Sequence, residues 1–106
     1  MTLEPKVATL IGFAERSGKL LTGSYPVEES IRHKKAKLIL VATDVNPKRL
    51  EILKFWCNDM GVPLQNIGTK DEYGKLLKKR AVGLLALTDA SMAKGIIQAV
   101  SAGRGD

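Results

Sequence analysis

Two short apolar runs constrain the fold of this 106-residue chain more than any other feature. Residues 37–43 and 81–87 place apolar side chains next to one another, without the alternation of apolar and polar positions that a half-exposed strand shows. Successive side chains of a strand point to opposite faces of its sheet, so the run from Lys37 to Thr43 must be covered on both faces. The chain therefore needs a sheet with packing partners on each side.

Segments with helical spacing lie before and between these runs. Residues 7–14 carry apolar side chains three and four positions apart, which indicates a helix with one buried face, and Gly18 can end it. Ser24 is predicted as the N-cap of a second helix that runs to about Lys35. Pro26 is tolerated in the first turn of that helix.

Two further helices have clear starting signals. Asn46-Pro47 combines a capping side chain with a proline at the first helical position, and Gly61 can end the helix that follows. Thr69 and Glu72 match a capping box, in which each side chain accepts a hydrogen bond from the other residue's backbone N–H. This pair predicts the start of a fourth helix.

The remaining segments complete an alternating order of strands and helices. Residues 19–22 and 64–67 are predicted as short strands, and Thr88 or Asp89 as the cap of a last helix. The alternation implies crossover connections, largely parallel pairing and helices on both faces of the sheet. The predicted fold is an α/β single domain over residues 1–106: a three-layer α/β/α sandwich with a mixed sheet of about four strands and about five helices.

Composition points to a polyanionic partner. The net charge of +6 favours polyanions through steering and counterion release, without selecting RNA over DNA or anionic lipid. The longest apolar run, residues 38–42, is far shorter than a membrane span of about 20 residues. Residues 1–5 lack the features of a secretory leader, so a cytoplasmic location and no membrane partner are expected.

The sequence assembles no recognisable active site. The segment from Gly12 to Leu20 resembles a P-loop, but its spacing is one residue too long, and Leu20 stands where a magnesium-binding hydroxyl is needed. His33 fits either a solvated helix end or a phosphate contact. Asp44 fits either a turn or cap, or a functional carboxylate after a strand. We therefore predict no enzyme activity, cofactor, metal site or small-molecule substrate.

Two minor features are given structural interpretations. Cys57 is the only cysteine, and we expect it to be a small buried apolar residue rather than a metal ligand. The Arg-Gly-Asp sequence at residues 104–106 is interpreted as a frayed tail rather than an adhesion motif.

Three basic clusters are the most informative charged features. They flank the first short strand, surround the end of the second helix and precede the last strand. Gly23-Ser24 adds a helix start whose free N–H groups favour phosphate oxygens. These segments form a site only if the fold brings them together. The cluster residues are Arg16, Lys19, Arg32, Lys34, Lys35, Lys37, Lys75, Lys78, Lys79 and Arg80.

Residues 23–44 resemble the ribosomal protein L-seven-Ae family of kink-turn RNA-binding proteins. The resemblance is carried by Lys-Ala-Lys-Leu at residues 35–38, Asp-x-x-Pro at 44–47, Gly-Val-Pro at 61–63 and the helix start at 68–74. It covers nearly the whole chain and is strongest for the short bacterial YlxQ-like branch.

The resemblance implies a non-catalytic protein that binds structured RNA. We expect a monomer that is linked to the ribosome or to translation and binds ribosomal RNA or another kink-turn-like RNA. Two neighbouring loops would hold the structured RNA: residues 23–25, and residues 79–83 between the fourth helix and the last strand. With the basic clusters, these loops define the predicted RNA-binding residues: Lys19, Gly23, Ser24, Tyr25, Arg32, Lys35, Lys37, Lys79, Arg80, Ala81 and Val82.

The chain departs from the family's pattern at the start of the second helix. Kink-turn binders carry Gly-x-Asn-Glu-x-x-Lys, whose Asn and Glu contact guanine edges and whose Lys reaches base or backbone acceptors. Tyr25, Pro26 and Glu29 stand at those three positions here. Each lost bidentate base contact costs about 1–3 kcal/mol of discrimination. Tyr25 can instead stack on an unpaired base.

Three functions follow, in decreasing order of support. The first is binding of structured RNA, with or without kink-turn specificity. The second is a protein-interaction module that has kept the fold and lost the RNA site, which the altered triplet favours. The third is an enzyme or nucleotide binder, which only the α/β architecture supports.

Overall fold

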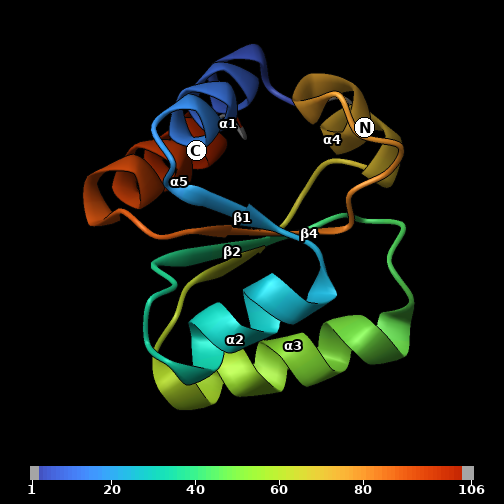
Figure 1. Ribbon diagram of the computed structural model, residues 1–106, viewed down its shortest axis with the longest axis vertical. Helices are drawn as coiled ribbons and strands as arrows, with labels where there is room; N and C mark the ends of the chain where they lie inside the picture. Colours follow the sequence, from blue (N-terminus) through green and yellow to red (C-terminus); the bar gives the residue numbers. More distant parts are fainter. Residues whose placement is uncertain (1–2, 104–106) are drawn as a thin grey trace.

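The structure, a computed structural model, describes residues 3–103, so the Arg-Gly-Asp sequence at 104–106 lies outside the described residues. Five helices and four strands alternate along this range, and the four strands form one mixed sheet, as predicted (Figure 1). The elements are α1 (Pro5–Arg16), β1 (Leu20–Thr22), α2 (Ser24–Arg32), β2 (Leu38–Val41), α3 (Pro47–Met60), β3 (Leu64–Asn66), α4 (Lys70–Leu77), β4 (Leu84–Leu87) and α5 (Ala90–Gly103).

The strands are ordered β1-β4-β2-β3 across the sheet. Only β2 and β3 are parallel, whereas β4 runs antiparallel to both β1 and β2. The expectation of largely parallel pairing is therefore wrong. The reason is that the segment containing α4 does not return the chain to the start of β3. Instead, β4 begins at the end of the sheet where β3 finishes, so it must run in the opposite direction.

Alternate residues of β2 belong to separate cores, which confirms that this strand is covered on both faces. Leu38 and Leu40 pack in a core with α1, α4 and α5, whereas Ile39 and Val41 pack in a core with α2 and α3. In Figure 1, α1, α4 and α5 lie above the sheet, and α2 and α3 lie below it. This arrangement is the predicted three-layer sandwich.

Several predicted helix ends are confirmed by hydrogen bonds. The Asn46 side chain accepts a bond from a first-turn N–H of α3 at 2.8 Å, and Gly61 ends α3 in the left-handed conformation, with φ at 71°. Asp89, rather than Thr88, caps α5, because its Oδ1 accepts a bond from the Met92 N–H at 2.9 Å.

The predicted capping box of α4 is only half formed. Thr69 Oγ1 accepts a hydrogen bond from the Glu72 N–H at 3.1 Å, as expected. The Glu72 carboxylate, however, accepts a bond from the Leu3 N–H at 2.6 Å and does not return to Thr69. The segment before α1 therefore takes the acceptor that a local capping box would use.

No helix within residues 3–103 combines the length and the apolar character needed to span a membrane.

Candidate nucleic-acid interface

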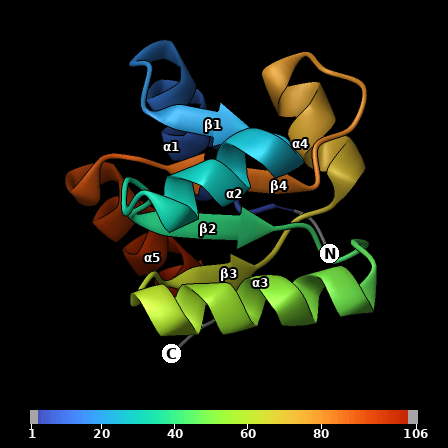
Figure 2. The ribbon, with the colours of Figure 1, turned by 60° about the horizontal axis from the view of Figure 1, so that its bottom comes forward.

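A groove of about 580 Å³ lies at the end of the sheet where β1 and β2 finish and β4 begins. We call this end the groove end. The starts of α2, α3 and α4 line the groove together with the loop before β4. Figure 2 shows these parts on the right side of the molecule. Each helix start carries about half a positive charge from its backbone, so the convergence of three favours an anionic ligand.

The start of α2 depends on a glycine. Gly23, not the predicted Ser24, is the N-cap, and its φ of 96° suits a residue without a Cβ. Its N–H donates to the Leu84 carbonyl at 3.1 Å, which ties the helix start to β4. Within the described chain, the N–H groups of Ser24 and Tyr25 have no partner, and Pro26 has no N–H. Two backbone donors are therefore available at the groove.

The loop between α4 and β4 folds back onto its own helix. Lys78 ends α4 in the left-handed conformation, with φ at 58°, and the Lys79 N–H donates to the Gly74 carbonyl at 2.8 Å. A Cβ on Gly74 would lie only 2.7 Å from the carbonyl oxygen of Arg80, so this close approach requires glycine. The Val82 N–H then donates to the carbonyl of Lys70, the first residue of α4, at 3.1 Å. These contacts hold the loop beside the start of α2.

The fold brings five of the predicted residues together as lining of the groove, namely Gly23, Ser24, Lys79, Ala81 and Val82. Tyr25 follows Ser24 directly and is 70% exposed. Arg80 is exposed in the same loop as Lys79. The two stretches that the resemblance singled out therefore lie side by side, although they are more than fifty residues apart in the sequence.

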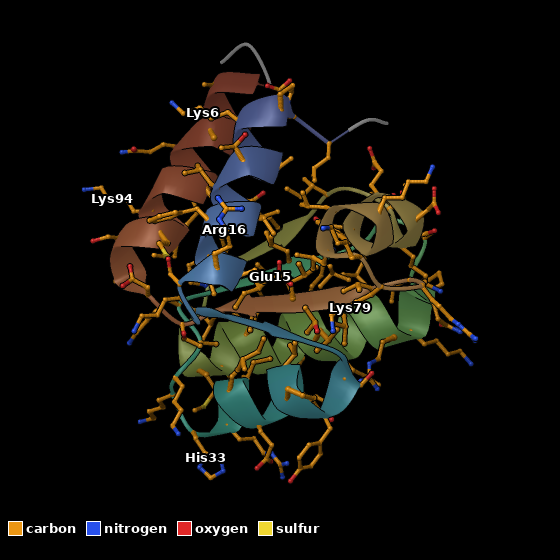
Figure 3. The ribbon with its side chains drawn as sticks, turned by 45° about the horizontal axis from the view of Figure 1, so that its top comes forward. Lys6, Glu15, Arg16, His33, Lys79 and Lys94 are labelled. Carbon is orange, nitrogen blue, oxygen red and sulfur yellow. The ribbon has the colours of Figure 1, made fainter. Side chains whose placement is uncertain are left out.

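The other four predicted residues lie at the opposite end of the sheet, which we call the lysine end. The Lys37 N–H donates to the Leu87 carbonyl, and the Lys19 carbonyl accepts from the Thr88 N–H, so both residues flank the far end of β4. Arg32 is in the last turn of α2, and Lys35 follows it. Arg32 is separated from the start of α2 by about 13 Å, the length of this nine-residue helix. Figure 3 shows Lys79 and His33 toward opposite ends of that helix.

Sequence reasoning missed six residues that also line the groove: Thr22, Val45, Asn46, Arg49, Lys70 and Leu84. Asn46 had been recognised only as a helix cap. The available signal was topological, because ligands in α/β folds often bind beyond strand ends where several helices begin. This signal can be applied only when the strand directions are known, because β2 and β3 finish at the end of the sheet where β4 starts.

The charges around the groove divide into paired and unpaired groups. Arg49 forms an ion pair with Glu28 of α2, so its charge is largely compensated. Asp44 Oδ1 accepts a hydrogen bond from the Lys70 N–H at 3.0 Å, which confirms its turn or cap role. The amino groups of Lys70 and Lys79 have no carboxylate partner within residues 3–103. They are free to meet a phosphate.

The lining combines these cations with apolar surface. Val45, Ala81 and Val82 line the groove together with Lys70 and Lys79. A ligand that offers phosphates together with flat rings suits such a surface, because the phosphates meet lysines and backbone N–H groups while the rings contact apolar atoms. Gly83 has no side chain, so the loop can approach Val45 closely at this position. A Cβ there would lie 3.0 Å from Val45 Cγ2.

The other candidate residues, Cys57 and His33, do not line the groove. Within the described residues, no three His, Cys, Asp or Glu side chains are grouped as metal ligands would be. Cys57 is buried, as predicted, and burial raises the pKa of its thiol to about 11. His33 is exposed at the end of α2, where its Nε2 lies 3.3 Å from Glu29 Oε1.

Fold and site together define a small α/β/α sandwich with a cationic groove where helix starts converge. The chain belongs to the Ribosomal protein L7Ae/L30e/S12e/Gadd45 family, whose model matches residues 5–97. This confirms the resemblance inferred from the sequence.

Named relatives cover most of the chain. RNA-binding protein YlxQ of Bacillus subtilis is 30% identical over 88 residues, which are 83% of this chain and 88% of that protein. Large ribosomal subunit protein eL8 of Thermoplasma volcanium is 30% identical over 100 residues, 90% of this chain and 83% of that protein. Some eukaryotic eL8 proteins also match, and the chain spans about a quarter of their length.

The fold is found in solved structures. The 15.5kD RNA binding protein of Giardia lamblia superposes with a TM-score of 0.77 at 19% identity, covering 95% of this chain and 92% of that one. At this identity the superposition shows a shared fold.

Proposed function

We propose that this protein binds structured RNA in the groove, without catalysing a reaction. One observation carries the proposal: two free N–H groups at the start of α2 and the unpaired amino groups of Lys70 and Lys79 converge on one apolar-lined groove. Phosphates bind to helix starts and lysines, and these contacts supply a large part of the affinity of proteins for nucleic acids.

The relatives support RNA as the ligand over other polyanions. One is named as an RNA-binding protein and another as a ribosomal protein, and both match more than four-fifths of this chain. The proposal accordingly includes a link to the ribosome or to translation, a cytoplasmic location and a monomeric state. Ribosomal RNA or another kink-turn-like RNA is the proposed class of ligand.

The start of α2 favours recognition of RNA shape and an unpaired base over guanine edges. Pro26 occupies the first turn and has no N–H, and the Glu29 carboxylate pairs with Arg32 and His33. Neither side chain can provide the contacts of the family's Glu and Lys. Tyr25 presents an exposed ring beside the groove, where stacking on one base is worth about 1–3 kcal/mol.

Titration of a kink-turn RNA and a sequence-matched straight duplex, at several salt concentrations, tests this function. If about five phosphates are contacted, log K should fall with log salt with a slope near −4. Preference for the kink-turn would show that the altered triplet retains the specificity. Equal affinity would restrict the protein to general RNA binding, and no binding at low salt would reject the function.

Paired charge reversals locate the site. Lys79→Glu with Arg80→Glu should weaken binding and flatten the salt dependence, because both cations lie in the groove loop. Lys6→Glu with Lys94→Glu makes the same change in net charge on α1 and α5, well away from Lys79 (Figure 3), and should have a much smaller effect. Equal losses would mean that the groove is not the site.

A second candidate function has its own observation. Phe55 is 70% exposed and Ile52 is 47% exposed on α3, and exposed apolar side chains on one helix favour a protein-interaction module. A stoichiometric protein recovered from nuclease-treated lysate by the wild type, and lost with Phe55→Ser, would support this function. Recovery that requires intact RNA would support the groove instead.

A further inference from the structure

Four lysines at the lysine end have no role in the groove and no ion-pair partner within the described residues. Lys34, Lys35 and Lys37 belong to the turn between α2 and β2, and Lys19 precedes β1. All four are exposed. Because Lys19 and Lys37 flank the same end of β4, the turn and Lys19 form one continuous surface, which we call the lysine patch.

The turn that carries three of these lysines is held by backbone hydrogen bonds. The N–H groups of Lys35 and Ala36 both donate to the Ser30 carbonyl, at 2.9 and 3.0 Å. Lys34 takes a left-handed φ of 58°, which is unfavourable for a residue other than glycine. The backbone that carries the lysines is therefore already ordered before any ligand binds.

Nearby acidic groups do not neutralise the patch. The Glu29 carboxylate is shared by Arg32 and His33, and Asp89 caps α5 through Met92. Asp59 lines a separate hollow with Arg32. Glu15, in the last turn of α1, forms no ion pair with these lysines within the described residues. The three helices that end here, α1, α2 and α3, contribute about half a negative charge each, and the start of α5 offsets one of them. Four ammonium groups exceed that compensation.

The surface of the lysine patch contains two hollows. Lys34 and Lys37 line one of about 240 Å³ with the backbone after α3, at Gly61 to Pro63. Lys35 lines another of about 440 Å³ with His33 and Glu29, whose carboxylate pairs with His33 and Arg32. Lysines that line hollows can approach phosphates from more than one side, unlike lysines on a convex face.

We infer that the lysine patch is a second phosphate-binding surface, through which the protein holds a second RNA segment while the groove holds the first. This inference rests on the proposed function. Helix ends at the patch oppose an anion, whereas helix starts at the groove attract one. The second segment therefore binds about tenfold or more weakly than the first. The two surfaces face opposite ends of a molecule about 30 Å across, so they engage separate segments.

The test measures how many RNAs one protein binds. A short kink-turn hairpin is prepared with two different fluorescent labels, and energy transfer between labels reports two hairpins on one protein at low salt. The patch variant combines Lys19→Gln, Lys35→Gln and Lys37→Gln, leaving Lys34 and its backbone conformation unchanged. The matched control combines Lys6→Gln, Lys54→Gln and Lys94→Gln, with the same loss of charge on α1, α3 and α5.

The wild type and the control should bring two hairpins together, whereas the patch variant should bind one, with an affinity for that first hairpin within about threefold of wild type. A wild type that binds a single hairpin at every salt concentration would overturn the inference and leave the groove intact. Loss of the second hairpin in the control as well would also overturn it. A wild type that binds no hairpin would reject the proposed function itself.

Discussion

The two ends of the sheet carry similar numbers of cations but differ in the backbone behind them. At the groove end, α2, α3 and α4 begin, and free N–H groups stand beside Lys70 and Lys79. At the lysine end, α1, α2 and α3 finish, and four lysines face partial negative charge from helix carbonyls. The number of lysines alone therefore does not locate an anion site, because helix direction sets the sign of the backbone's contribution.

The turns that follow α2 and α4 begin alike but lead the chain to different ends of the sheet. Each contains a lysine with φ at 58°, Lys34 in one and Lys78 in the other. After Lys34 the chain enters β2 within four residues, whereas after Lys78 it first folds back along α4. That extra length, packed against Gly74, carries Lys79 to the groove.

Substitution of Gly74 should have the largest effect. Gly74→Ala places a Cβ 2.7 Å from a backbone oxygen, so the loop must shift, and overpacking of this kind costs about 1–3 kcal/mol. Urea unfolding should show the loss of stability, and RNA affinity should fall because Lys79 moves.

Gly95→Ala is the matched control in α5. Its Cβ would meet only Leu10 Cδ1, at 3.8 Å, so helix propensity should raise stability by about 0.5–1 kcal/mol and leave RNA binding unchanged. Equal behaviour of the two variants would contradict the account of the loop.

Tyr73 is a buried residue of α4, the helix whose start lines the groove. Its hydroxyl donates to the Ile67 carbonyl at 2.7 Å, so Tyr73→Phe should cost about 1–2 kcal/mol. Burial, with the nearby Glu72 charge, raises the pKa of Tyr73 above its ordinary value. Above pH of about 10 the unfolded tyrosine ionises while the folded one stays neutral, so stability should fall as pH rises.

Urea unfolding at pH 8, 10 and 11 checks this dependence. Tyr73→Phe should reduce the decline and leave the part that the buried Cys57 thiol causes, whereas Tyr25→Phe, at an exposed ring, should keep the wild-type profile. A wild-type decline in Tyr73→Phe would show that other groups cause it.

Two helix caps at opposite ends of the sheet give a smaller, paired test. Asn46 caps α3 at the groove, and Asp89 caps α5 at the lysine end. Replacing either with alanine should cost about 1 kcal/mol of stability, measured by thermal unfolding. Only Asn46→Ala should also weaken RNA binding. Weaker binding in both would indicate a general effect of stability.

The smallest effect is expected for the two left-handed lysines. Lys34→Gly and Lys78→Gly should each raise stability by up to about 1 kcal/mol, because glycine adopts this φ without strain. Lys35→Gly, where φ is not positive, should lower stability by about 0.5–1 kcal/mol. Chemical denaturation distinguishes these signs, and a loss in all three would contradict the strain argument.

Local signals in the sequence predicted most of the fold. The unbroken run at residues 38–41 predicted a doubly covered strand, and Asn46 and Gly61 marked the two ends of α3. Strand direction could not be predicted this way, because the path of residues 70–83 depends on the contact of Gly74 with the Arg80 backbone. The capping box at Glu72 failed for a similar reason, since a distant N–H took its acceptor.

The candidate site was predicted only where the resemblance supplied its loops. Gly23 and Lys79 were placed correctly beside each other, whereas Lys19 and Lys37 lie at the other end of the sheet. Charge clusters in a sequence carry no information about which end of a strand they flank. Once β4 is known to run antiparallel to β1 and β2, each lysine can be assigned to an end.

Binding of a single structured RNA by two charge-reversal variants shows which end of the sheet holds the RNA. Lys70→Glu with Lys79→Glu acts at the groove, and Lys19→Glu with Lys37→Glu makes the same charge change at the lysine end. With limiting RNA, the groove pair should lose at least about tenfold in affinity, and its salt slope should shrink by about 0.7–0.9 for each lost phosphate contact. The lysine-end pair should keep the first RNA within about threefold of wild type. Equal losses in the two variants would contradict the claim that the groove end holds the RNA.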